Sequence, residues 1–486
     1  MLTIFILYLV SVMGIAWWWS RRDAKTNEDF VLGGKRFSGT ALALSERATG
    51  ESAWLLLGLT GEAFALGLSM IWVAIGCVVG IGFIWFAMAE RLRKETDRTG
   101  SMTVSSLLAR KFPGSERSVG LLSALIVVFF FVFYIAAQFS GSGKVLQKTF
   151  GLDPLWGIII SSVVVTVYCM WGGFIAVVVT DVFQAILMIF TLVVFPIIAV
   201  FVAASHNIHL AETIRNADPS YLSLTGKEVG GSAVILILSG LSWALGYTGQ
   251  PQLLTRMMAI RSRKDVVTAK WVAIIWTVFA YVGAILIGIF GYAFVKGGLL
   301  ASDTAKLAED CEKILPVMVV TLVTPVVAGI LLSGVISAMM STASSELTVS
   351  SASISEDIYN NLRTTKESPK RLLALNKILT VAVGIVAIIM ALTMQDTVYG
   401  LVSYAWSGIG SSFGPALLLL LYWKRFSRAG IFASLISGTL GTVVWKNWLA
   451  GPTGVSERLA SFVFAFLMAV LFSILIPEKR ANKSRE

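Results

Sequence analysis

Hydroxyl side chains crowd the end of one long apolar segment, and their oxygens could hold a dehydrated metal cation. The apolar run from Pro316 to Met340 is followed by seven serines and two threonines between Ser341 and Ser355. Small alkali and alkaline-earth ions are held by oxygen, and polar groups inside a membrane segment commonly mark an ion path. Alternatively, these hydroxyls bond to carbonyls of the preceding turn or join neighbouring helices. The spacing alone leaves both interpretations open.

Three charged residues lie inside a second apolar segment, 42–61, which reads LALSERATGESAWLLLGLTG. Each charge at mid-bilayer costs on the order of 2.5–3.5 kcal/mol on insertion scales. Glu46 and Arg47 could instead snorkel to the inner interface if the span begins near Ala48. Glu51 is flanked by glycine and serine, with membrane-length sequence on its far side. This pattern favours a discontinuous helix, whose freed carbonyls can bind a cation.

A third segment, 239–258, combines glycines and a proline with aromatic side chains. Trp243, Tyr247 and Gln250 are one helical turn apart and share a face, and Pro251 follows them. An interfacial aromatic belt is one explanation, and a ligand-facing wall beside a second helix break is the other. Interrupted helices in the second and seventh spans are typical of a transporter built from two inverted five-helix repeats.

The elements that must position these residues are membrane-spanning helices. The 486 residues are 56% hydrophobic and 14% charged, whereas roughly 25% of the residues in a soluble domain are charged. Segments long enough to span a bilayer recur along the whole chain, and we identify thirteen: 2–20, 40–59, 68–90, 119–147, 155–171, 178–204, 231–249, 271–295, 314–341, 373–394, 398–423, 429–449 and 457–477.

These spans predict an all-α polytopic protein with thirteen transmembrane helices, some of them broken, and a single transmembrane domain over 1–486. Its expected parts are a leader helix with the first inner loop (1–39), a first repeat (40–204), a second repeat (231–423), and two last helices with a cytoplasmic tail (424–486). The first span lacks a basic region before it, so we expect no cleavable signal.

The distribution of positive charge predicts the orientation and excludes one class of partner. With the N-terminus outside, the inner loops hold 28 of the 39 lysine and arginine residues, which is the positive-inside bias. The net charge of +11 is therefore spread over short loops next to the membrane. It indicates contact with anionic lipid headgroups rather than nucleic acid.

The other chemistry-bearing residues do not suggest an enzyme. The three cysteines are too scattered for a disulfide framework or a metal cluster, and two histidines in an outer loop lack a third ligand. The sequence has no Walker loop, no GxSxG elbow and no HExxH motif.

Five pieces of the chain resemble the sodium:solute symporter family, and within it most closely the bacterial sodium/proline symporters. The resemblance runs from about residue 4 to residue 445. Its most specific pieces are SAWLLLGLTG (52–61), VVTDVFQAILM (178–188), GYTGQPQLLTRMMA (246–259), AGILLSGVISAMMSTASSELTVSSASISEDIY (328–359) and GLVSYAWSGIGSSFGP (400–415). The fold that it implies is a leader helix followed by the five-plus-five inverted repeat.

The resemblance also implies site residues. Sodium, the coupling ion of the family, would be held by carbonyls at the break of the second span and by hydroxyls at the end of the ninth. An acid of the family, in the sixth span, would support it, although a helix cap near the inner interface is an alternative role for that acid. The residues implied for sodium are Ala48, Glu51, Ala338, Ser341, Thr342 and Asp181. The proline pocket implied by the family would be lined by Ser52, Trp54, Tyr134, Trp243, Tyr247, Gln250 and Pro251, with Tyr404 and Trp406 close by.

The chain departs from the family pattern around the predicted sodium site. The proline transporters have small residues in place of Glu46 and Arg47, aspartate in place of Gly50, and methionine in place of Glu51. One possible arrangement has Arg47 reaching the ninth-span hydroxyls, where it would replace sodium. In the other, which we favour, Arg47 lies at the inner interface and Glu51 supplies the negative charge for sodium.

We therefore expect a secondary symporter of the inner (plasma) membrane that imports a small amino acid, first of all L-proline, with sodium. The main alternative is a proton-coupled or ion-independent carrier of another small solute, with Arg47 and Glu51 replacing the sodium site. A sensor would need an effector domain, and nine residues follow Pro477. A channel would need a ring of charges or carbonyls repeated by symmetry.

Overall fold

The computed structural model describes residues 1–23, 26–112, 114–363, 367–394 and 396–478, and within these ranges it is helical without any strand. The helices are α1 (Leu2–Asp23), α2 (Asn27–Leu32), α3 (Gly39–Gly50), α4 (Thr60–Leu66), α5 (Ile71–Phe83), α6 (Ala89–Thr99), α7 (Val104–Ala109), α8 (Glu116–Phe150), α9 (Pro154–Ser205), α10 (Leu210–Ala217), α11 (Gly230–Leu241), α12 (Trp243–Tyr247), α13 (Pro251–Met258), α14 (Arg263–Lys296), α15 (Thr304–Glu309), α16 (Ile314–Leu322), α17 (Pro325–Ala352), α18 (Pro369–Thr393), α19 (Val398–Tyr422), α20 (Arg428–Val444), α21 (Ala450–Thr453) and α22 (Glu457–Leu475).

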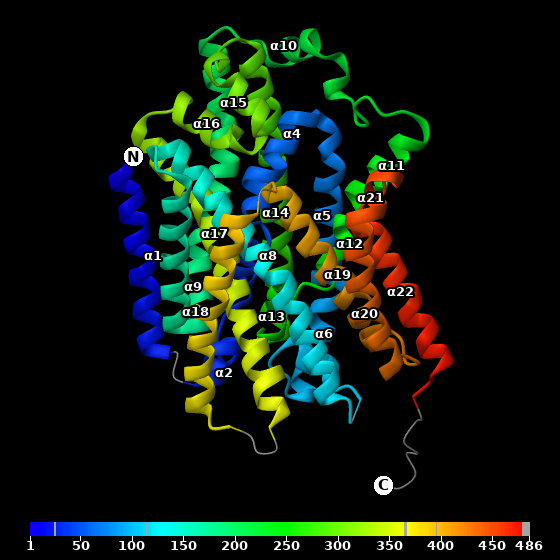
Figure 1. Cartoon of the computed structure of the whole chain (residues 1–486). Coiled ribbons are helices and arrows are strands. Elements are labelled where there is room, and N and C mark those ends of the chain that lie inside the picture. The colour runs from blue at the N-terminus through cyan, green and yellow to red at the C-terminus, as the bar shows by residue number, and fades with distance from the viewer. Residues whose placement is uncertain (24–25, 113, 364–366, 395, 479–486) are drawn as a thin grey trace.

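The long helices form one bundle whose two ends carry different short helices (Figure 1). The end bearing α10, α15 and α16 is opposite the end bearing α2 and α6. In α17 and α19, 83% of the most apolar stretch is buried, against 22% in α1 and 28% in α22. Hence α17 and α19 form the core of the bundle, while α1 and α22 turn most of their apolar surface outward, as lipid-facing helices do.

Eleven helices of the described chain are long and apolar enough to cross a membrane. The all-α polytopic architecture is therefore confirmed, whereas the predicted count of thirteen is not. The difference arises at two places. The second predicted span breaks at Glu51, after α3, and resumes at the π-helical turn Trp54–Leu59, from which it continues with the third predicted span as one helical stretch, Trp54–Thr99. The fifth and sixth predicted spans form the single element α9.

Gly173 divides α9 in two. At about 1.5 Å per residue, the 52 residues of α9 would extend roughly 78 Å if straight, more than twice the hydrocarbon core. The backbone leaves the helical region at Gly173, with φ 51° and ψ −138°. A Cβ atom there would also lie 2.5 Å from the Phe30 ring. Only glycine can therefore turn the chain at this point.

Gly173→Ala is expected to lower the free energy of unfolding by about 1–3 kcal/mol, because it imposes backbone strain and a clash. Gly151→Ala is a matched control, because Gly151 also has positive φ (67°) but nothing within 4 Å of its Cβ position. Denaturant titration of the purified protein in mixed micelles measures both. Equal losses in the two variants would show that the Phe30 contact contributes nothing.

The hydroxyl-rich segment is helical throughout, which corrects the predicted end of the ninth span near residue 341. The helix α17 continues to Ala352 and then as a π-helix over Ser353–Asn360. Its hydroxyls bond back to preceding carbonyls, for example Thr348 to Ser344 O at 2.8 Å. Polarity was mistaken for a helix end because hydropathy does not register these local bonds.

Candidate functional site

The break between α3 and the π-helical turn meets the middle of α17. Thr342 Oγ1 donates a hydrogen bond to the carbonyl oxygen of Thr49 at 2.8 Å. Ala48 and Ala338, on the same two helices, have no exposed surface. The structure thus brings the α3 break and the α17 hydroxyls together, as the sodium-site prediction requires. These oxygens are the ligand type that an alkali cation takes.

Asp181 of α9 joins this cluster. Its Oδ1 accepts from Ser341 Oγ at 2.6 Å, and its Oδ2 accepts from Ser45 Oγ at 2.6 Å. Asp181 is fully buried and lies in mid-helix, so it is not a helix cap. The predicted ion-site residues Asp181, Ser341 and Thr342 therefore share one polar cluster with α3.

A guanidinium group that the sequence analysis did not single out occupies the same cluster. Arg256 Nη2 lies 3.1 Å from Asp181 Oδ2, and it also donates to Ser345 Oγ at 2.5 Å and Thr49 Oγ1 at 3.0 Å. Arg256 Nε donates to Ser45 Oγ at 3.1 Å. The charge distribution predicts an inner loop over 250–270, which would contain Arg256, but this residue lies on the buried helix α13, which begins at the predicted break. One feature of the sequence could have indicated its burial, because the residues that flank Arg256 remain largely apolar after Pro251.

Arg47 has a different set of partners from either predicted arrangement. Its Nη1 lies 2.8 Å from Glu51 Oε1, and its Nε donates to Glu46 Oε2 at 2.6 Å. All three side chains have zero exposure, so Glu46 and Arg47 do not snorkel to an interface. Arg47 also donates to Thr277 of α14 at 3.3 Å, and within the described part of the chain it makes no hydrogen bond to the α17 hydroxyls. The pairing of Arg47 with Glu51 is as expected from their spacing, but both predictions about where Arg47 lies are wrong.

Two tyrosines complete the coordination of Glu51. Tyr281 donates to Glu51 Oε2 at 2.6 Å and Tyr247 to Oε1 at 3.3 Å. Trp85 Nε1 donates to Glu46 Oε2 at 3.0 Å. Glu51 is thus saturated by protein donors rather than free to supply charge to an ion. Tyr281 was missed, because nothing in its local sequence sets it apart from other aromatic residues of a spanning helix.

Most of the predicted substrate residues form one aromatic cluster. Trp54 and Trp243 stack with ring centroids 4.4 Å apart and planes 10° apart, and Tyr247 meets Trp406 edge-on at 4.6 Å. Gln250 joins the cluster through a 3.0 Å bond to Trp406 O.

The structure also places the other predicted substrate residues, Ser52, Tyr134, Pro251 and Tyr404. The Ser52 and Tyr134 hydroxyls are 3.5 Å apart, and Pro251 is buried at the first turn of α13. Tyr404 does not join the rings above, because it packs against Phe130 and Phe133 of α8.

A pocket beside α11 and α21 borders the aromatic cluster. It has a volume of about 560 Å³ and includes Tyr399 and Arg458 among its lining residues. The Arg458 guanidinium lies 4.6 Å from the Trp243 ring centroid, and Tyr399 lies 5.6 Å from it. Trp243 therefore lies between this pocket and Trp54, the other member of the stacked pair. Tyr399 is a second aromatic neighbour that the motifs did not indicate.

Three relatives share about a third of their residues with nearly the whole chain. The osmoregulated proline transporter OpuE of Bacillus subtilis is 33% identical over 96% of this chain and 93% of its own length. The high-affinity proline transporter PutP of the same species is 35% identical, covering 91% and 90%. The sodium/proline symporter of Escherichia coli is 33% identical, covering 97% and 92%.

Solved structures share the fold. A Na⁺-coupled sialic acid symporter superposes with a TM-score of 0.81 over 98% of both chains, at 18% identity. MhsT, solved in complex with L-phenylalanine, superposes with a TM-score of 0.54, covering 90% of this chain and 97% of its own, at 17% identity. These likenesses confirm the predicted transporter fold. The residue limits of its two repeats stay a prediction.

A sequence model of the sodium:solute symporter family matches residues 30–438. Together with the relatives and the broken helices, this match confirms the resemblance drawn from the motifs. The chain is a multi-pass membrane protein, and it belongs to the sodium:solute symporter family.

Proposed function

We propose that this protein imports a small amino acid, with L-proline as the first candidate, in symport with sodium. The observation that carries the proposal is the contact between Thr342 and the α3 break at Thr49, 2.8 Å long, with the stacked Trp54–Trp243 pair on the far side of that break. One broken helix thus borders both the oxygen cluster and the aromatic cluster. Binding at either cluster would stabilise the same backbone, which is how ion and substrate become coupled.

The proposed ligands of sodium are the carbonyls near Ala48 and Ala338 and the oxygens of Ser341, Thr342 and Asp181. The residue roles follow from the family resemblance, and the oxygen-only donor set supports them. Glu51 is not retained as a charge donor, because Arg47 and two tyrosines saturate it.

The proposed substrate residues are those of the aromatic cluster with its polar neighbours, namely Ser52, Trp54, Tyr134, Trp243, Tyr247, Gln250, Pro251 and Trp406. A flat, largely apolar wall suits a small ring, and half-helix ends at the breaks can meet the charged groups of a zwitterion. The relatives named as proline transporters support this choice of substrate.

We place the protein in the plasma membrane with its N-terminus outside and its C-terminus in the cytoplasm. The positive-inside bias supports this orientation even after Arg256 is removed from the loop count. The start of α1 and the end of α22 lie at opposite ends of the bundle in Figure 1. The end that carries α2 and α6 is then cytoplasmic.

A second candidate is a carrier that does not require sodium. It is favoured by one observation: the Arg256 guanidinium already lies 3.1 Å from Asp181 among the hydroxyls. A fixed cation there could replace a bound one. The proton-coupled variant shares this geometry and differs in which gradient drives uptake.

Uptake of radiolabelled proline into proteoliposomes, with sodium and pH gradients imposed separately at constant ionic strength, tests both candidates. Symport with sodium predicts uptake that collapses when choline replaces sodium. Thr342→Ala should then raise the sodium concentration for half-maximal uptake about five- to tenfold, which corresponds to roughly 1–1.4 kcal/mol. Ser351→Ala is the control, because among the described residues the Ser351 hydroxyl bonds to Thr348 O of its own helix and to no other group. Uptake that follows the pH gradient alone would favour the second candidate.

A further inference from the structure

The buried charges of the bundle do not balance. Of the described residues, six charged side chains are at most 1% exposed: Glu46, Arg47, Glu51, Asp181, Arg256 and Glu346. Arg47 pairs with two of the acids and Arg256 with a third. Glu346 remains: within the described chain it has no ion pair, and neither of its carboxylate oxygens has a hydrogen-bond partner.

A bare carboxylate in this position needs a neutralising partner, which is either a bound cation or a proton. Burial of an ionised carboxylate without partners is so costly that buried charges are normally paired or bound to a metal. Inside a membrane domain, such a residue commonly marks an ion path. The surroundings of Glu346 should therefore show where its counter-charge comes from.

Glu346 lies on α17 one turn beyond Thr342, so the two residues are on nearly the same face. Ser350 follows after one further turn, and its Oγ also lacks a hydrogen-bond partner in the described structure. Two carboxylate oxygens and one hydroxyl oxygen are thus unused on successive turns. The first of these residues, Glu346, is about 6 Å farther along the helix axis than Thr342.

The helix α8 covers this part of α17 in antiparallel packing. Ser142 Oγ lies 3.2 Å from Met339 Sδ, and at the other end Asn361 Nδ2 donates to Glu116 O at 2.8 Å. Glu346 falls between these two contacts and within electrostatic range of Tyr134.

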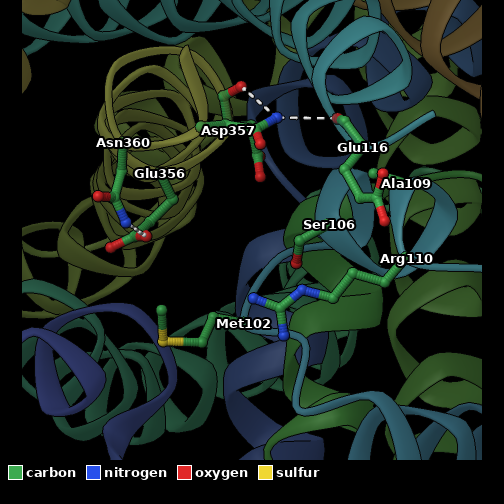
Figure 2. Close-up of a pocket in the computed structure, with 9 residues that line it drawn as sticks. Met102, Ser106, Ala109, Arg110, Glu116, Glu356, Asp357 and Asn360 are labelled. Carbon is green, nitrogen blue, oxygen red and sulfur yellow. Dashed lines mark hydrogen bonds between the residues drawn. The ribbon is translucent and has the colours of Figure 1, made fainter. Parts of the chain in front are cut away.

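A pocket of about 370 Å³ lies farther along the same helix pair. Its lining includes Glu356 and Asp357, on the π-helix that follows α17, and Glu116 at the start of α8, which lies across the pocket from them in Figure 2. Asp357 is 3% exposed and accepts from Thr103 Oγ1 at 2.9 Å. A cation that leaves the Thr342 cluster along α17 would pass Glu346, then Ser350, and reach this pocket at the end of the bundle.

We propose that Glu346 and Ser350 form a second sodium-binding position on the cytoplasmic release path, between the Thr342 cluster and the pocket at Asp357. This inference rests on the proposed sodium symport. Sodium fits better than a proton, because three oxygens are unused and a proton bonds covalently to one. Glu346 would neutralise the departing ion and prevent its return to Thr342.

Right-side-out membrane vesicles that contain the full-length protein and defined internal sodium test this position. Internal sodium should inhibit proline uptake by occupying the release path. Glu346→Gln should raise the internal sodium concentration for half-inhibition at least threefold and leave the external sodium requirement within twofold. Ser350→Ala should act in the same direction, and Glu346→Asp should retain most of the wild-type inhibition. Glu309→Gln, which removes an exposed carboxylate at the end of α15, should change neither the half-inhibitory internal sodium concentration nor the external sodium requirement.

The outcomes separate this inference from the proposed function. Uptake that ignores external sodium in the wild type would overturn the proposed function and this inference with it. Sodium-driven uptake whose inhibition by internal sodium is unchanged in both Glu346→Gln and Ser350→Ala would overturn this inference alone. So would a Glu346→Gln variant that loses its response to internal pH and keeps its response to internal sodium, because Glu346 would then bind a proton. Ser350→Ala decides the matter if Glu346→Gln fails to fold.

Discussion

Arg256→Gln is expected to lower the free energy of unfolding by about 3–5 kcal/mol, because it leaves the Asp181 carboxylate buried without its cation. The pair is 1% and 0% exposed, so water cannot replace the lost guanidinium. Asp181→Asn in the same chain should restore more than half of the loss, since both charges are then absent. Denaturant titration in mixed micelles measures Arg256→Gln, Asp181→Asn and the double variant.

The control for this prediction is an arginine–aspartate pair at the bundle surface. Arg261 lies 2.8 Å from Asp265 but is 53% exposed. Arg261→Gln should cost less than about 1 kcal/mol, as exposed ion pairs do. Losses that simply add in the Asp181→Asn/Arg256→Gln double variant would show that the two residues do not interact in the folded protein.

Arg256→Gln also distinguishes the two coupling proposals. If the protein is a sodium symporter, the freed carboxylate should bind sodium more tightly, and half-maximal uptake should need less sodium. If Arg256 is a permanent substitute for sodium, wild-type uptake is independent of sodium and becomes dependent on it in the variant. Both comparisons use the folded fraction of each variant in proteoliposomes.

Trp243→Ala is expected to raise the apparent KM for proline about tenfold to a hundredfold. The Trp243 indole stacks on Trp54 at 4.4 Å, and the Arg458 guanidinium of the neighbouring pocket lies over its ring. Removal of the indole loses on the order of 1.5–3 kcal/mol of favourable apolar burial. Initial uptake rates over a range of proline concentrations measure the change, with membrane expression quantified in parallel.

Tyr404→Ala is the matched control for Trp243→Ala. Tyr404 was also predicted to lie near the substrate, but its ring packs on Phe130 and Phe133 instead. Its removal should leave the apparent KM within about threefold. A KM that responds equally to both substitutions, or to neither, would move the substrate away from the Trp54–Trp243 stack.

Much of the architecture could be read from short-range patterns. Hydropathy over about twenty residues identifies spanning helices, and glycine or proline inside such a stretch marks the place where backbone bonds are broken. The breaks after Gly50 and before Pro251 were therefore predictable. The hydroxyls of Ser341 and Thr342 could also be singled out as candidates for the sodium site, because oxygen atoms stand out on an apolar helix.

The number of spans was harder to predict, since a helix in a bundle need not end where its sequence becomes polar. Hydroxyl groups such as that of Thr348 donate hydrogen bonds to carbonyls of their own helix. In contrast, Gly173 separates two helices inside α9 although the sequence on both sides of it stays apolar. Window averages do not detect either effect.

The sequence by itself determined the membrane class, the family and the two helix breaks, because each of these depends on residues within a few turns of one another. Only the tertiary structure decided which buried charged side chains form ion pairs with one another. Asp181 is paired with Arg256, 75 residues away, rather than with Arg47. Glu346, one residue after a partner of Arg256, has no partner among the described residues. Electrostatic interactions in a low-dielectric core depend on separations of a few ångströms, and those separations follow from how distant helices pack.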